Sequence, residues 1–63
     1  DLKVKTALFS SDELDATNIK VITENGEVFL MGLVTKNQAD ISVDIARNVG
    51  GVNRVFKIFE YVK

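Results

Sequence analysis

The stretch NGEVFLMGLVT, residues Asn25 to Thr35, decides the fold. It opens with Asn25-Gly26, the dipeptide preferred in a two-residue type I′ hairpin turn because both central positions need positive φ. It then runs Val-Phe-Leu-Met-Gly-Leu-Val, with no polar residue to mark a solvent side. We therefore predict a hairpin whose second strand is apolar on both sides, although a chain of 63 residues has little material to cover them.

The turn also predicts the register of the hairpin. Counting outward from it pairs Glu24 with Glu27 and, at the far end, Ile19 with Gly32. Since side chains alternate along a strand, the hairpin has two distinct sides. One side carries Ile19, Val21, Val28, Leu30, Gly32 and Val34. The other side carries Lys20, Ile22, Phe29, Met31 and Leu33.

Segment 36–49 has the pattern of an amphipathic helix with defined ends. Thr35 followed three residues later by Gln38 is a capping-box spacing, and Gly50-Gly51 can adopt the left-handed conformation that ends a helix. The centre of its apolar side is made of small residues, which predicts a close approach to the sheet at the gap left by Gly32. These small residues are Ala39, Ser42 and Ala46.

Two further segments complete the predicted fold. Residues 2–9 place Val4 and Leu8 on one helical face, and residues 53–62 are rich in aromatic and β-branched side chains typical of a strand. The element order is then αββαβ, in which the strand-helix-strand connection makes the last strand parallel to the second. We predict an α+β sandwich: a single domain over residues 1–63, with a three-stranded mixed sheet and two helices packed on one face.

Composition excludes several classes of function. The net charge is −1, so the chain lacks the basic footprint of a nucleic-acid binder, and no apolar run is long enough to span a membrane. It contains no cysteine and no histidine, which removes the commonest zinc ligands and thiol nucleophiles. We therefore expect no metal, no cofactor and no catalytic residue, with a small enzyme or small-ligand binder as the alternative class.

Two groups of acidic and polar residues could form sites, but neither pattern favours one. A calcium loop could be pictured from Asp12, Glu13, Asp15 and Asn18, but it lacks the glycine and the terminal glutamate of an EF-hand, so a solvated loop is the preferred interpretation. Glu24 and Glu27 flank the hairpin turn in the open. Nothing there would desolvate either carboxyl group and raise its pKa for acid catalysis.

The ordered set of turn, strand and helix residues resembles the BON domain, named for bacterial osmotically inducible and nodulation-associated proteins. The stretch from Thr23 to Thr35 is particularly similar to the second BON domain of outer-membrane lipoproteins of the DolP type. The residues that carry the resemblance are Asn25, Gly26, Val28, Leu30, Gly32, Val34, Ile45, Ala46, Val49, Gly51, Val52 and Val55.

The resemblance implies a non-enzymatic module of the bacterial envelope that binds phospholipid or associates with membranes, often beside a second BON domain. It implies a periplasmic location at the outer membrane through a lipidated parent protein, and a role in outer-membrane integrity and stress response. Because the chain starts at Asp1 without a methionine, we also expect it to be a piece of a longer protein.

The side of the hairpin away from the helices is the first candidate site. Family members commonly carry Thr or Ser on this side of the second strand, whereas here it is apolar. A contiguous apolar patch of this kind marks an interaction surface, with a tandem BON domain or another envelope protein as the expected partner. There are two alternatives: self-association through the same face, or coverage of part of the face by the third strand or by a segment upstream of this chain. The candidate docking residues are Ile22, Phe29, Met31, Leu33, Phe56 and Ile58.

The first helix is the second candidate site. Lys3 and Lys5 accompany the apolar Leu2 and Phe9, and a basic, apolar helix can lie in the interface of an anionic membrane. The expected partner is anionic phospholipid, bound weakly, because the acidic loop that follows opposes tight binding. The alternative is that both lysines are simply solvated.

Overall fold

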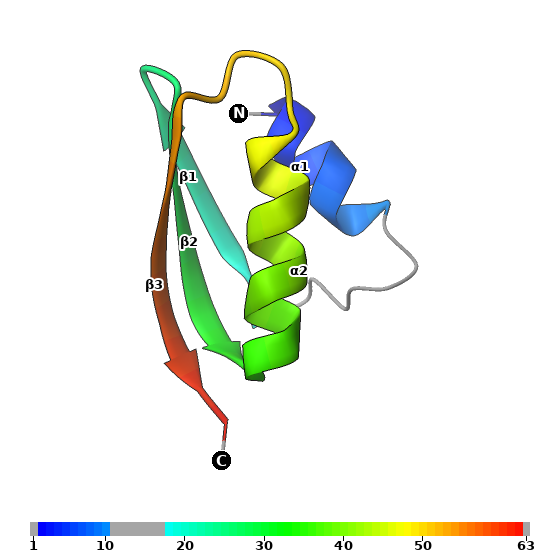
Figure 1. Ribbon diagram of the computed structural model, residues 1–63, viewed down its shortest axis with the longest axis vertical. Coiled ribbons are helices and arrows are strands. Elements are labelled where there is room, and N and C mark those ends of the chain that lie inside the picture. The colour runs from blue at the N-terminus through cyan, green and yellow to red at the C-terminus, as the bar shows by residue number, and fades with distance from the viewer. Residues whose placement is uncertain (1, 11–17, 63) are drawn as a thin grey trace.

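The computed structural model describes residues 2–10 and 18–62, which form two helices and a three-stranded sheet. Figure 1 shows both helices on the same side of the sheet, so that its other side is open. The predicted α+β architecture and its αββαβ order are confirmed. The elements are α1 (Leu2–Phe9), β1 (Lys20–Glu24), β2 (Glu27–Val34), α2 (Lys36–Arg47) and β3 (Arg54–Tyr61).

The hairpin of β1 and β2 has the predicted turn and register. Asn25 and Gly26 have φ values of 52° and 79°, as a type I′ turn requires. Glu24 pairs with Glu27, and the antiparallel ladder continues to Lys20 and Met31. The ladder ends there, one pair short of the predicted pairing of Ile19 with Gly32. β3 runs parallel to β2 on its other edge, which gives the sheet order β1-β2-β3.

Helix α2 begins where the sequence predicts. The Gln38 N–H donates to Thr35 Oγ1 at 3.1 Å, and the Thr35 N–H donates to Gln38 Oε1 at 3.0 Å, which completes the capping box. The helix ends at Arg47, two residues before the predicted end. Asn48 is its C-cap, with its backbone N–H donating to the last turn and its side-chain amide donating to the Asp44 carbonyl oxygen. The left-handed residue comes later, at Gly51.

The core lies between the sheet and the helices. The small residues predicted to bring α2 close to the sheet are all buried. The buried Ser42 hydroxyl has a hydrogen-bond partner, because it donates to the Ala39 carbonyl oxygen at 2.8 Å. The hairpin positions predicted to face the helices are likewise buried, except Gly32, which is half-buried. The buried apolar residues are Val4, Leu8, Ile19, Val21, Val28, Leu30, Val34, Ala39 and Ala46.

Gly32 has a different role from the one predicted. A Cβ atom at this position would overlap the Asn18 carbonyl oxygen and lie 3.4 Å from Ile19 Cα, so the crowding comes from the chain entering β1. Its φ of 136° is also one that side-chain-bearing residues rarely adopt. The nearest atoms thus belong to residues 18–19 and not to α2, so glycine is needed here first for this backbone contact.

Candidate interaction surfaces

The open side of the sheet gathers all six predicted docking residues. The parallel register pairs Phe29 with Phe56 and Met31 with Ile58, so both β3 residues lie on the same side as their β2 partners. Ile22 pairs with Phe29 from the other edge. The open-face patch therefore consists of Ile22, Phe29, Met31, Leu33, Phe56 and Ile58.

The open-face patch is accessible along all three strands. Leu33 and Ile58 are each 54% exposed, and Ile22 and Phe56 are exposed as well. In the centre, the rings of Phe29 and Phe56 stack with their centroids 5.0 Å apart and an interplanar angle of 11°. This stack partly shields Phe29 and holds a flat aromatic surface across β2 and β3. The third strand therefore extends the patch instead of covering it.

Charged residues surround the open-face patch. Strand alternation puts charged side chains at the ends of each strand on the same side as the patch. An apolar centre with a polar rim is the arrangement found in protein interaction sites. The residues of this rim are Lys20, Glu24, Glu27, Arg54 and Glu60.

The second candidate surface is the outer side of α1. Val4 and Leu8 are fully buried and fix the orientation of the helix. Lys3 and Lys5 are exposed, and Phe9 is 59% exposed. At about 100° per residue, Phe9 lies roughly 40° from Lys5, while Lys3 lies at the opposite margin of the exposed arc. The solvent-exposed side of the helix therefore carries one aromatic ring, that of Phe9, between two lysines. The side chain of Leu2 lies outside the described residues.

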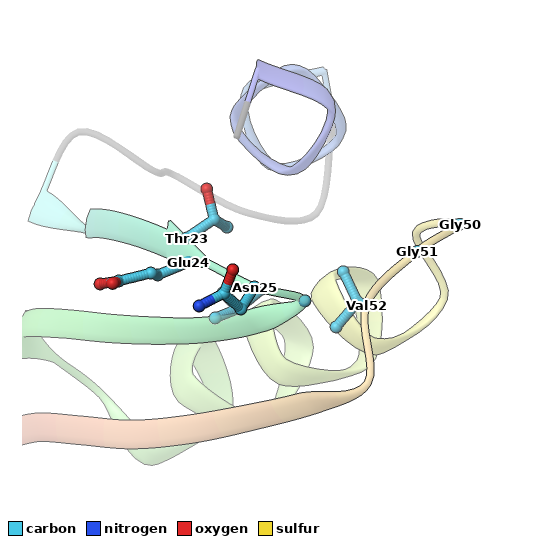
Figure 2. A pocket seen from close by; sticks show the side chains of 8 residues that line it. Thr23, Glu24, Asn25, Gly50, Gly51 and Val52 are labelled. Carbon is cyan, nitrogen blue, oxygen red and sulfur yellow. The ribbon is translucent and has the colours of Figure 1, made fainter.

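A hollow of about 350 Å³, which sequence reasoning missed, lies where the hairpin turn meets the connection from α2 to β3. Figure 2 shows Thr23, Glu24 and Asn25 on one side of it and Gly50, Gly51 and Val52 on the other. The two sides are joined by a hydrogen bond from the Asn53 N–H to the Gly26 carbonyl oxygen, at 2.7 Å. The sequence signal for this contact between the hairpin turn and the α2–β3 connection is limited to the two turn-forming pairs, Asn25-Gly26 and Gly50-Gly51.

The described lining of the hollow offers few charged side chains with which to bind a ligand. Among the described residues that line it, Glu24 is the one with a charged side chain. Within the described part of the chain, no three Asp or Glu residues come together as a metal site would require. Asp12, Glu13 and Asp15, for which a solvated loop is the preferred interpretation, lie outside the described residues.

Comparison with known proteins decides the family. The BON domain model matches residues 2–62, nearly the whole chain. The chain belongs to the BON domain family. The predicted resemblance is thereby confirmed, and the αββαβ fold described above is that of a BON domain.

Two curated relatives resemble this BON domain over 60 residues, which is 95% of the chain. One is the 21 kDa hemolysin of Actinobacillus pleuropneumoniae, at 52% identity. The other is the outer membrane lipoprotein DolP of Haemophilus influenzae, at 48% identity. In each case the chain spans 31% of the relative's length. In residues 2–10 and 18–62 of this BON domain, no helix is long and apolar enough to cross a membrane.

Proposed function

We propose that this BON domain is a non-enzymatic module of the bacterial envelope that contacts anionic phospholipid through the outer side of α1. The proposal includes a location on the periplasmic side of the outer membrane, in a lipidated parent protein, and a contribution to outer-membrane integrity. Support comes from family membership and from the relative named as an outer membrane lipoprotein.

The observation that carries the lipid proposal is the exposure of Phe9 between two lysines on a helix whose other side is buried. Lysine stems can lie along an apolar surface while their ammonium groups reach anionic headgroups. Each lysine contributes about 1 kcal/mol near an anionic surface, and transfer of the exposed part of Phe9 adds roughly 1 to 1.5 kcal/mol. The sum of about 3 to 3.5 kcal/mol corresponds to weak binding by one domain, with a Kd of roughly 3 to 6 mM.

Vesicle cosedimentation tests this proposal. The chain should bind vesicles rich in phosphatidylglycerol weakly, bind neutral phosphatidylcholine vesicles less, and lose binding as salt rises. Phe9→Glu should abolish binding because it removes the aromatic ring and adds a negative charge that the anionic vesicle surface repels. Leu33→Glu is the matched control, because Leu33 is similarly exposed but lies on the open-face patch. Equal loss of binding in both variants would contradict the assignment to α1.

A second candidate function is docking of a sister BON domain on the open-face patch. The observation that favours it is the exposed aromatic stack of Phe29 and Phe56 with its charged rim, since a contiguous apolar patch of this kind marks an interaction surface. The relatives are about three times as long as this chain, which leaves room in them for a further domain. A flat sheet side suits the surface of another domain better than it suits lipid chains.

The docking proposal is tested by adding the remainder of the parent protein, produced separately, to the labelled chain. Chemical shifts should change along the open-face patch, and Leu33→Glu should remove the response while Phe9→Glu keeps it. Changes that persist in the Leu33 variant would contradict docking at the patch. A response to increasing concentration of the chain alone, lost with Leu33→Glu, would instead indicate self-association through this face.

A further inference from the structure

In the part of the chain that the structure describes, the outer edge of β3 has no strand paired to it. Among the described strands, the order β1-β2-β3 puts it at the border, and it is as long as the central strand β2. Long edge strands present a row of backbone donors and acceptors to which another strand can pair. The chain has no proline to block this edge.

The hydrogen bonds of β3 show which of its residues face outward. The Val62 N–H donates to the Val34 carbonyl oxygen at 2.8 Å, and the Arg54 N–H donates to the Gly26 carbonyl oxygen at 3.3 Å. Backbone groups in a parallel ladder alternate between the two sides of a strand, so the even-numbered residues of β3 bond to β2. The odd-numbered residues therefore offer their N–H and C=O groups to the free edge. They are Val55, Lys57, Phe59 and Tyr61.

The sequence of this edge, RVFKIFE over residues 54–60, is complementary to itself when reversed about Lys57. Arg54 and Glu60 lie three residues on either side of Lys57, and Phe56 and Ile58 lie one residue on either side. Antiparallel pairing of two copies about this point would set Arg54 opposite Glu60 twice, and Phe56 opposite Ile58 twice.

We propose that two copies of this chain associate through the edges of β3, antiparallel and centred on Lys57. The pairing uses only outward backbone groups, with about six new hydrogen bonds at the three pairs formed by Val55, Lys57 and Phe59. Because odd-numbered residues pair with odd-numbered residues, the helices of both copies lie on one side of a six-stranded sheet. The two open-face patches then join on the other side through Phe56 and Ile58.

Charge complementarity favours a second copy over an unrelated peptide as the occupant of this edge. A peptide would need its own acidic and basic residues six positions apart, whereas the chain supplies both in register. The two Lys57 side chains oppose the association, since like charges directly opposite one another are unfavourable. Lys57 is exposed, and its long side chain can turn away from its symmetry mate. The dimer should therefore be weak and sensitive to this residue. The inference is independent of lipid binding by α1.

Sedimentation equilibrium of the 63-residue chain, from micromolar to millimolar concentration, tests the proposal. We expect a monomer–dimer equilibrium. Arg54→Glu should weaken it at least about tenfold, because two attractive pairs become repulsive, and adding Glu60→Arg should restore it. Lys57→Thr should tighten the dimer. Lys57→Pro should give a monomer with an unchanged circular dichroism spectrum, since the N–H that it removes is not used within the domain.

The charge exchange keeps the test decisive even if the proline variant unfolds. A chain that stays monomeric at millimolar concentration would overturn the proposal. So would a dimer that Arg54→Glu leaves intact, or one that the double exchange does not rescue. The pair of changes Phe29→Thr and Met31→Thr distinguishes the two surfaces: it should spare an edge dimer, and a dimer that it alone abolishes would be formed by the open-face patch.

Discussion

Replacement of Gly32 by alanine tests the close backbone contact between β2 and residues 18–19, which lead into β1. A single Cβ atom there would overlap the Asn18 carbonyl oxygen, so even the smallest side chain must displace backbone. Overpacking costs about 1 to 3 kcal/mol, and a side-chain-bearing residue at a φ of 136° costs another 1 to 3 kcal/mol. We expect Gly32→Ala to lower the free energy of unfolding by about 2 to 4 kcal/mol, since some of the strain relaxes.

Urea and thermal unfolding followed by circular dichroism would measure this loss. For a domain of this size, 2 kcal/mol corresponds to a fall in melting temperature of roughly 8 to 16 °C. Gly50→Ala is the control, because a Cβ atom there meets nothing within 4 Å, and it should change stability by less than about 0.5 kcal/mol. If Gly32→Ala is as harmless as Gly50→Ala, Gly32 faces free space and the argument from residues 18–19 fails.

Three further changes should separate core, patch and helix cap. Leu30→Ala truncates a fully buried side chain and should cost about 2 to 5 kcal/mol of unfolding free energy. The double change Phe29→Thr and Met31→Thr should leave the domain folded and cost at most about 2 kcal/mol of unfolding free energy, mainly because the ring stack is lost. Unfolding as severe as that of the Leu30 variant would show that both sides of β2 are core. Thr35→Ala removes the acceptor of the Gln38 N–H and should cost about 1 kcal/mol in the same denaturation assay, and no change would show that the capping box contributes nothing.

The hairpin could be predicted in detail because its information is local. Asn25-Gly26 selects a turn whose geometry sets the register, and the register then assigns each side chain of β2 to a side. The same alternation places Phe56 and Ile58 on the open side only if β3 keeps the phase of β2, and the register of Phe29 with Phe56 and of Met31 with Ile58 shows that it does. The composition of the patch was therefore predictable, whereas what binds to it stays a prediction.

Features that depend on distant backbone contacts could not be predicted. The sequence indicates that glycine is preferred at position 32, but the atoms that crowd it belong to Asn18, outside the ladder. The end of α2 was also missed by two residues, because the Asn48 side chain caps the helix before Gly50 and Gly51 are reached. The sequence shows Arg54 and Glu60 at equal distances from Lys57, but only the hydrogen bonds of β3 indicate that the backbone of Lys57 faces the free edge.

Amide chemical-shift mapping with vesicles tests the central claim, that α1 meets anionic phospholipid, most directly. With phosphatidylglycerol vesicles, the amide signals of Lys3 to Phe9 should shift or broaden, less so as salt rises, and neutral vesicles should leave them unchanged. The Phe9→Glu variant should show no response. Changes confined to the hairpin or to α2, or equal changes with neutral vesicles, would contradict the claim.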